Sequence, residues 1–188
     1  MQKPTAIQDR APRSAVVFDV PTVAHGAEIH RLVGECRPLD LNSTYAYLLL
    51  CEHFGDTCIR AEYAGATIGF ISAYRPPGRP DVLFVWQVAT APSMRGRGLA
   101  KTMLRELLRR DALGDCRYVE ATVSPSNEPS RRLFHALARE IGAPVAERVL
   151  FLERDFGDEQ HEQEVLIRIG PIPGKQTKRS PRHESQDF

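Results

Sequence analysis

The sequence predicts one α/β domain in which a mixed central β-sheet is flanked by about four helices. The chain has 188 residues, which is enough for one substantial core but not for two enzyme domains. Strand-like segments follow one another first and alternate with helices later, which favours a mixed sheet over regular β-α alternation. Residues 82–89 are apolar on both faces, as is typical of a central strand.

The N-terminal part is expected to form a strand and two helices. Residues 14–20 are rich in β-forming side chains, and Thr22 can cap a helix that follows. A second helix is expected after Asn42 or Ser43, and the loop before it contains Asp40. The apolar positions of the first helix recur with a 3.6-residue period at Ile29, Leu32, Val33 and Cys36.

The middle of the chain predicts a hairpin followed by the central strand. Residues 58–63 and 67–74 have strand character around the turn Ala64-Gly65. The proline-rich loop 75–80 ends the hairpin because proline fits neither a helix interior nor a central strand.

A glycine-containing turn and an alternating pattern follow the central strand. Leu99, Met103, Leu104, Leu107 and Leu108 form the apolar stripe of a helix. The remaining elements are expected as a strand at 117–123, a turn at 125–127, a helix at 129–141, and strands at 145–152 and 163–169.

Composition excludes several classes of protein. With 25 Lys+Arg against 24 Asp+Glu, a nucleic-acid binder driven by bulk positive charge is not expected. The longest apolar run, 46–51, is too short to cross a membrane, and no secretory signal is recognised, so we expect a cytoplasmic protein. The four cysteines, Cys36, Cys51, Cys58 and Cys116, have neither zinc-site nor disulfide spacing, so we expect reduced, mostly buried thiols and no metal.

The two ends differ from the middle in composition. Residues 1–13 and 172–188 are rich in Pro, Ser, Gln and charge, which predicts disordered tails around a domain spanning 14–171.

The turn at Gly96 and Gly98 could hold a phosphate. Glycines let main-chain amides approach a ligand closely, and these amides open a helix whose dipole favours an anion. The residues after Gly98, Leu99-Ala100-Lys101, exclude both a P-loop and a dinucleotide fingerprint. From the glycines alone, a phosphate site and a plain strand-to-helix turn remain equally open.

Residues 88–100 resemble the acetyl-CoA signature of the GCN5-related N-acetyltransferases, R/Q-x-x-G-x-G/A after a strand. The resemblance implies that the turn amides bind the coenzyme A pyrophosphate and that the preceding strand pairs with the pantetheine arm. The implied coenzyme residues here are Val88, Thr90, Arg95, Gly96, Arg97, Gly98, Leu99 and Ala100.

Residues 127–134 resemble a second element of the same family, N-x-x-A/S-x-x-L-Y. The resemblance adds Asn127, Ser130 and Phe134 to the coenzyme residues. Because Phe134 stands where the family often has a tyrosine acid, we expect the leaving thiolate to be protonated by the intermediate's own ammonium or by water.

The resemblance runs from about residue 14 to 171 and narrows to the diaminobutyrate acetyltransferases of ectoine biosynthesis, most specifically over 38–47, 72–81 and 83–88. It implies acetyl transfer to the γ-amine of a small diamino acid during the response to osmotic stress. Family and symmetry priors suggest a homodimer. The implied substrate residues are Asp40, Tyr45, Trp86, His161 and Glu164.

These residue types suit a diamine that carries two ammonium groups and one carboxylate. Asp40 and Glu164 supply negative charge, and Trp86, two residues before Val88, supplies an aromatic wall. Ordinary alternatives stay open, since Asp40 could cap a helix and Trp86 could be a core residue. Arg75 and Arg79 could bind an anion or serve only at the surface.

The chemistry requires a base and a polarised thioester carbonyl. Glu164, Asp40 and His161 remain alternatives for the base. A main-chain N–H at or just after Val88 is expected to polarise the carbonyl. The alternatives in function are an acetyltransferase for another small cationic amine (polyamine, ornithine or aminoglycoside) and a non-catalytic acetyl-CoA sensing module.

Overall fold

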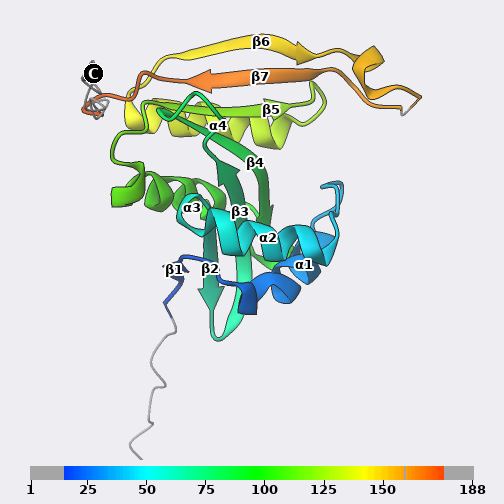
Figure 1. Cartoon of the computed structure of the whole chain (residues 1–188), viewed down its shortest axis with the longest axis vertical. Coiled ribbons are helices and arrows are strands. Elements are labelled where there is room, and N and C mark those ends of the chain that lie inside the picture. The colour runs from blue at the N-terminus through cyan, green and yellow to red at the C-terminus, as the bar shows by residue number, and fades with distance from the viewer. Residues whose placement is uncertain (1–14, 159, 176–188) are drawn as a thin grey trace, which may run out of the picture.

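A single seven-stranded sheet organises the chain (Figure 1). The computed structural model describes residues 15–158 and 160–175. The order across the sheet is β1-β2-β3-β4-β5-β7-β6. The strands are β1 (Val17–Asp19), β2 (Ile59–Tyr63), β3 (Ala66–Tyr74), β4 (Val82–Thr90), β5 (Tyr118–Val123), β6 (Val145–Phe151) and β7 (Glu164–Ile169).

Four α-helices cover the two faces of the sheet in the described part of the chain (Figure 1). One apolar cluster joins α3 and α4 to one face, and a second joins α1 and α2 to the other. The helices are α1 (Gly26–Gly34), α2 (Thr44–Phe54), α3 (Leu99–Leu108) and α4 (Glu128–Ile141). The predicted mixed sheet with about four helices is therefore confirmed.

Local signals set most element boundaries as expected. Ser43 caps α2, with its Oγ accepting from the Ala46 N–H at 3.2 Å. Thr22 caps a short 3-10 turn, Val23–His25, rather than α1 itself, so the first helix begins later than its cap signal suggested. Asp40 does not cap α2 either.

The sheet opens between its two central parallel strands. β4 pairs with β5 only from Val82 to Phe84, whereas it pairs with β3 from Phe84 to Thr90. On its other edge β5 pairs with β7 from Val119 to Val123. Residues 85–90 of β4 therefore have a strand neighbour on one side only within the described structure, and we call them the open half of β4.

A bulge at Trp86 lies where the sheet opens. Ala73 pairs with Val85 and Ser72 pairs with Gln87, so Trp86 is the extra residue of β4. Val85 and Val88 consequently pack on the same core cluster although they are three residues apart. Trp86 is 46% exposed, so β4 is not buried along its whole length.

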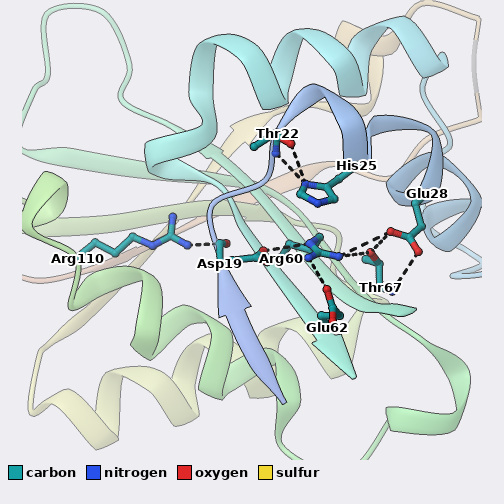
Figure 2. A network of polar contacts seen from close by, with 8 residues as sticks. All are labelled: Asp19, Thr22, His25, Glu28, Arg60, Glu62, Thr67 and Arg110. Atoms are coloured by element: carbon teal, nitrogen blue, oxygen red, sulfur yellow. Dashed lines mark hydrogen bonds and ion pairs between the residues drawn. The ribbon is translucent and has the colours of Figure 1, made fainter. Parts of the chain in front are cut away.

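A buried ion cluster attaches the N-terminal segment and α1 to the sheet (Figure 2). Arg60, 5% exposed, forms a bidentate pair with Asp19 at 3.0 and 2.7 Å and donates to Glu62 at 2.7 Å. Its Nη1 contacts Thr67, whose hydroxyl donates to Glu28 of α1 at 2.6 Å. The guanidinium is fully paired, so the cluster fixes β1 and α1 against β2 and β3.

Ordered contacts continue past Pro171, where the sequence placed the domain boundary. Ile172 is 8% exposed within the core, and Lys175 Nζ donates to the Leu108 and Leu113 carbonyls at 2.8 Å. The segments 1–13 and 176–188 of the predicted tails lie outside the described residues. None of the helices within 15–158 and 160–175 has the length and apolar character of a membrane span.

Candidate active site

A cleft of about 510 Å³ lies beside the open half of β4. The strand end, the glycine turn and the first turns of α3 and α4 form its walls. The lining residues are Val88, Thr90, Met94, Arg95, Gly96, Gly98, Leu99, Ala100, Lys101, Pro129, Ser130 and Leu133.

The glycine turn presents main-chain donors to this cleft. Gly96 and Gly98 have φ of 73° and 75°, a region that side chains with a Cβ rarely adopt. Gly98 is the N-cap of α3 and no side chain caps that helix. The free N–H groups and the positive end of the helix dipole therefore suit an anion such as a diphosphate.

The cleft also has positive side chains at its rim. Arg95 lines it, and its Nη2 lies 3.5 Å from the Arg37 carbonyl, a weak contact. Lys101 is paired with Glu140 at 2.6 Å. Arg95 is thus the cation best placed to meet a phosphate.

Most of the predicted coenzyme residues lie together in this cleft, and three do not. Arg97 is exposed outside the lining set. Asn127 caps α4, its Oδ1 accepting from the Ser130 N–H at 3.2 Å. Phe134 is 3% exposed in the core. The sequence analysis missed Met94, Lys101, Pro129 and Leu133, although each adjoins one of its motifs or lies within it.

Asp40 lies in the loop before α2, Tyr45 lies in the first turn of α2, and Trp86 lies at the bulge of β4. Gln87 Nε2 donates to the Asp40 carbonyl at 2.8 Å, which holds the loop before α2 against the strand. No described residue donates to the exposed Asp40 carboxylate, so it is available to a cation. Tyr45 is 67% exposed at the start of α2.

His161 and Glu164 form a pair at the start of β7. Glu164 accepts from Ser124 Oγ at 2.7 Å and lies 3.9 Å from His161 Nε2. The His161 ring stacks on Phe156 at 4.0 Å, and its Nδ1 lies 2.6 Å from the Glu162 carbonyl. A carbonyl only accepts, so Nδ1 carries a proton, and in the neutral ring Nε2 is the acceptor on the Glu164 side.

Strand directions bring these groups to one end of the sheet. β4 and β5 are parallel and β7 is antiparallel to β5, so Glu164 lies at the same end as Thr90. The loop that contains Asp40 also reaches this end of β4, because Cys36 Sγ donates to the Thr90 carbonyl at 3.2 Å. No direct contact joins the Asp40 group to the His161 group in the described residues.

Arg75 and Arg79 are engaged elsewhere. Arg75 pairs with Asp115 at 2.6 Å, and Arg79 pairs with the buried Glu120 at 2.8 Å. Glu120 is also paired with Arg168. Both loop arginines lie near the start of β4, away from the cleft. The structure therefore favours a role in these ion pairs over binding of an anion in the cleft.

The thiols match their predicted state. All four cysteines are free and buried. Burial raises the pKa of Cys58 to about 12 and that of Cys51 to about 11. Among the residues that the structure describes, no group of His, Cys, Asp or Glu could hold a metal ion.

A second cavity, of about 320 Å³, lies on the outer face of α4. Its arginines are largely paired, since Arg131 contacts Glu147 at 2.8 Å and Arg132 contacts Glu128 at 2.7 Å. This cavity lacks the free main-chain donors of the first, so the cleft beside β4 is the better ligand site.

Comparison with known proteins agrees with this geometry. The acetyltransferase (GNAT) family matches residues 27–138. L-2,4-diaminobutyric acid acetyltransferase from Bordetella parapertussis is 52% identical over 86% of this chain and 88% of its own length. The enzyme of that name from Marinococcus halophilus is 45% identical over 84% of this chain and 91% of its own length.

A solved structure is similar over nearly all of its length. It is the diaminobutyrate acetyltransferase EctA from Paenibacillus lautus in complex with its substrate L-2,4-diaminobutyric acid and coenzyme A. It is 45% identical, with a TM-score of 0.82 over 85% of this chain and 96% of that chain. A glycine turn at the opening of a split sheet, together with these relatives, shows that the chain belongs to the L-2,4-diaminobutyric acid acetyltransferases of the GNAT family.

Proposed function

We propose that this chain transfers the acetyl group of acetyl-CoA to the γ-amine of L-2,4-diaminobutyrate, giving N(γ)-acetyl-diaminobutyrate and coenzyme A. The observation that carries the proposal is the cleft beside the open half of β4, where the sheet separates and main-chain N–H groups are free. Trp86 lies in the same half of the strand, and its side chain is exposed. The complex of the Paenibacillus lautus relative with both ligands supports it.

Coenzyme A would be held by the turn amides and by the open half of β4. The N–H groups around Gly96 and Gly98 suit its diphosphate, and β4 has unpaired backbone for the pantetheine amides. A main-chain N–H near Val88 would then polarise the thioester carbonyl. Exact placement of the acetyl group between β4 and β5 supplies the alignment that the reaction needs.

The diamine must lose a proton before it attacks. An alkylammonium has a pKa of about 10, so free amine at pH 7 costs roughly 4 kcal/mol. The His161–Glu164 pair suits this task because it places an acceptor nitrogen and a carboxylate 3.9 Å apart. The free Asp40 carboxylate suits binding of the second ammonium.

The tetrahedral intermediate then expels the thiolate. Phe134 has no ionisable group, so it offers no acid at the position where the family often has tyrosine. We therefore assign protonation of the sulfur to the intermediate's own ammonium proton or to water.

A thiol-release assay tests the function directly. Diaminobutyrate, ornithine, lysine and putrescine are compared as acceptors at saturating acetyl-CoA, and proton NMR of the product reports γ against α acetylation. We expect kcat/KM for diaminobutyrate about 100-fold above that for putrescine, which lacks the carboxylate. Preference for putrescine would favour a polyamine acetyltransferase, and tight coenzyme binding without turnover on any amine would favour a sensing module.

We further propose that the chain acts as a cytoplasmic homodimer in ectoine biosynthesis under osmotic stress. The sequence resemblance supports the pathway, and the four free thiols suit a reducing compartment. Light scattering of the purified chain tests the dimer, and growth of a deletion strain at high salt tests the pathway.

A further inference from the structure

A buried hydrogen-bond chain links β4 to the loop between α1 and α2, and the chemistry above does not use it. Its side chains are Tyr47 of α2, 0% exposed, and Gln87 of β4, 4% exposed. A buried polar network of this kind fixes geometry because each member must keep its partners.

In this series of hydrogen bonds, each donor and acceptor assignment fixes the next. Gln87 Nε2 donates to the Asp40 carbonyl at 2.8 Å, and the Tyr47 hydroxyl donates to Gln87 Oε1 at 3.2 Å. The Asn42 N–H in turn points to the Tyr47 oxygen at 3.4 Å. Because a carbonyl only accepts, the Gln87 amide nitrogen must face Asp40, which leaves Oε1 for Tyr47. The loop is therefore held on both sides of Leu41.

The same strand serves the coenzyme cleft on its other face. Val88 and Thr90 line the cleft, whereas Ala89 packs with Tyr47 in the α1–α2 cluster. Successive side chains of a strand point to opposite faces, so Gln87 faces α1 and α2 while Val88 faces the cleft. Its own N–H donates to Ser72 Oγ at 3.2 Å beside the Trp86 bulge, which fixes its position in the strand.

A third contact ties the loop to the end of the strand. Cys36 Sγ donates to the Thr90 carbonyl at 3.2 Å. The loop therefore runs along the open half of β4 from Thr90 back to Gln87.

We propose that Gln87 and Tyr47 are positioning residues that fix Asp40 relative to β4. They would thereby set the distance between the ammonium held at Asp40 and the acetyl group aligned on the strand. This role of Asp40 rests on the proposed function, whereas the attachment of the loop is a property of the fold.

Steady-state kinetics of three variants test the inference. Gln87→Leu removes both side-chain bonds, Tyr47→Phe removes only the bonds through the hydroxyl, and Ile29→Val is a matched control. Ile29 is fully buried in the same cluster and makes none of these hydrogen bonds. All three variants should lower the Tm.

The KM for diaminobutyrate should rise about tenfold in Gln87→Leu and about threefold in Tyr47→Phe, and it should not rise in Ile29→Val. The KM for acetyl-CoA should stay within about twofold in every variant. A folded Gln87→Leu chain whose diamine KM is unchanged, or one that matches Ile29→Val in both constants, overturns the inference.

Hydrogen exchange gives a readout that does not depend on activity. The Asn42 amide should exchange about tenfold faster in Gln87→Leu and Tyr47→Phe than in the unmodified chain and in Ile29→Val. If the unmodified chain fails to acetylate diaminobutyrate while Asn42 exchange responds in this way, the proposed function is wrong and the attachment of the loop stands. Unchanged exchange in both variants overturns the attachment itself.

Discussion

The coenzyme side and the diamine side of the opening are built from different materials. The coenzyme side centres on one run of chain, 94–101, whose main-chain donors open α3, with the end of β4 and the first turn of α4 beside it. The diamine side collects Asp40, Trp86 and Glu164 from a loop, a central strand and a late strand. A site built from backbone should tolerate side-chain changes but depend on its glycines, whereas a site built from side chains should show the opposite dependence.

The largest effect is expected from Glu164→Gln on the diamine side. The change keeps the size of the side chain and its bond from Ser124 but removes the negative charge beside His161. We expect kcat/KM for diaminobutyrate to fall about 100-fold or more, with the Kd for acetyl-CoA within about twofold. Turnover kinetics and calorimetry measure the two quantities.

Glu153→Gln is the matched control for this change because Glu153 is an exposed carboxylate in the 3-10 helix Glu153–Phe156 nearby. It should behave like the unmodified chain. Weakened acetyl-CoA binding in Glu164→Gln with normal diamine kinetics would contradict the division between the two sides.

Gly98→Val should have the next largest effect, on the coenzyme side alone. A Cβ at Gly98 meets no atom within 4 Å, so the cost comes from its φ of +75° and from the shifted turn amides. We expect the KM for acetyl-CoA to rise about 30-fold while the KM for diaminobutyrate changes little.

Gly78→Val separates loss of the coenzyme site from general strain. Gly78 has a φ of +76° and equally open surroundings, but it lies in the proline-rich loop away from the cleft. The two variants should lose similar stability in urea unfolding, and only Gly98→Val should lose coenzyme binding. Equal coenzyme KM values in both variants would show that the turn amides are not the binding groups.

Acid should weaken the attachment of α1, the helix before the Asp40 loop. The Thr67 hydroxyl bond lowers the pKa of Glu28 on α1 below its usual 4.5. A lowered folded-state pKa gives stability that is present above about pH 4.5 and is lost as the pH falls through the folded value.

Amide exchange in α1, corrected for intrinsic rates, should therefore accelerate between roughly pH 5 and pH 3. Thr67→Val should flatten this dependence because the Glu28 pKa returns toward its ordinary value. Equal acceleration of α1 in the unmodified chain and in Thr67→Val would contradict a local role for Glu28.

The smallest effect is expected at the exposed face of α4, which belongs to neither side. Arg132 and Glu128 pair at 2.7 Å but are 69% and 74% exposed. Arg132→Ala should change the free energy of unfolding by less than about 0.5 kcal/mol and leave both KM values unchanged. A clear rise in the acetyl-CoA KM would extend the coenzyme site to this face.

Local patterns predicted the elements because their causes lie within a few residues. The serine cap before Thr44, the glycine turn before Leu99 and the proline loop after Tyr74 each act on their own neighbourhood. The Trp86 bulge had no such signal, since it arises from the register between β3 and β4. The ordered contacts of Ile172 and Lys175 were likewise hidden, because their partners lie far back in the chain.

In the candidate site, too, the residues set by local motifs were predictable and the contacts between distant segments were not. Eight of the predicted coenzyme residues line the cleft, seven on the glycine turn and its flanks and Ser130 in the first turn of α4. Phe134, by contrast, packs into the core despite its place in a motif. The partners of Arg75 and Arg79 could not be foreseen, because Asp115 and Glu120 come from later elements.

By itself the sequence determined the order of the elements, the place of the glycine turn before α3 and the family, because these depend on local spacing and motifs along the chain. Only the tertiary structure decided that β4 parts from β5 after Phe84, that Gln87 holds the Asp40 loop, and that Ser124 donates to Glu164. Those relations join residues that are neighbours only in space, so packing and strand register fix them and no local pattern does.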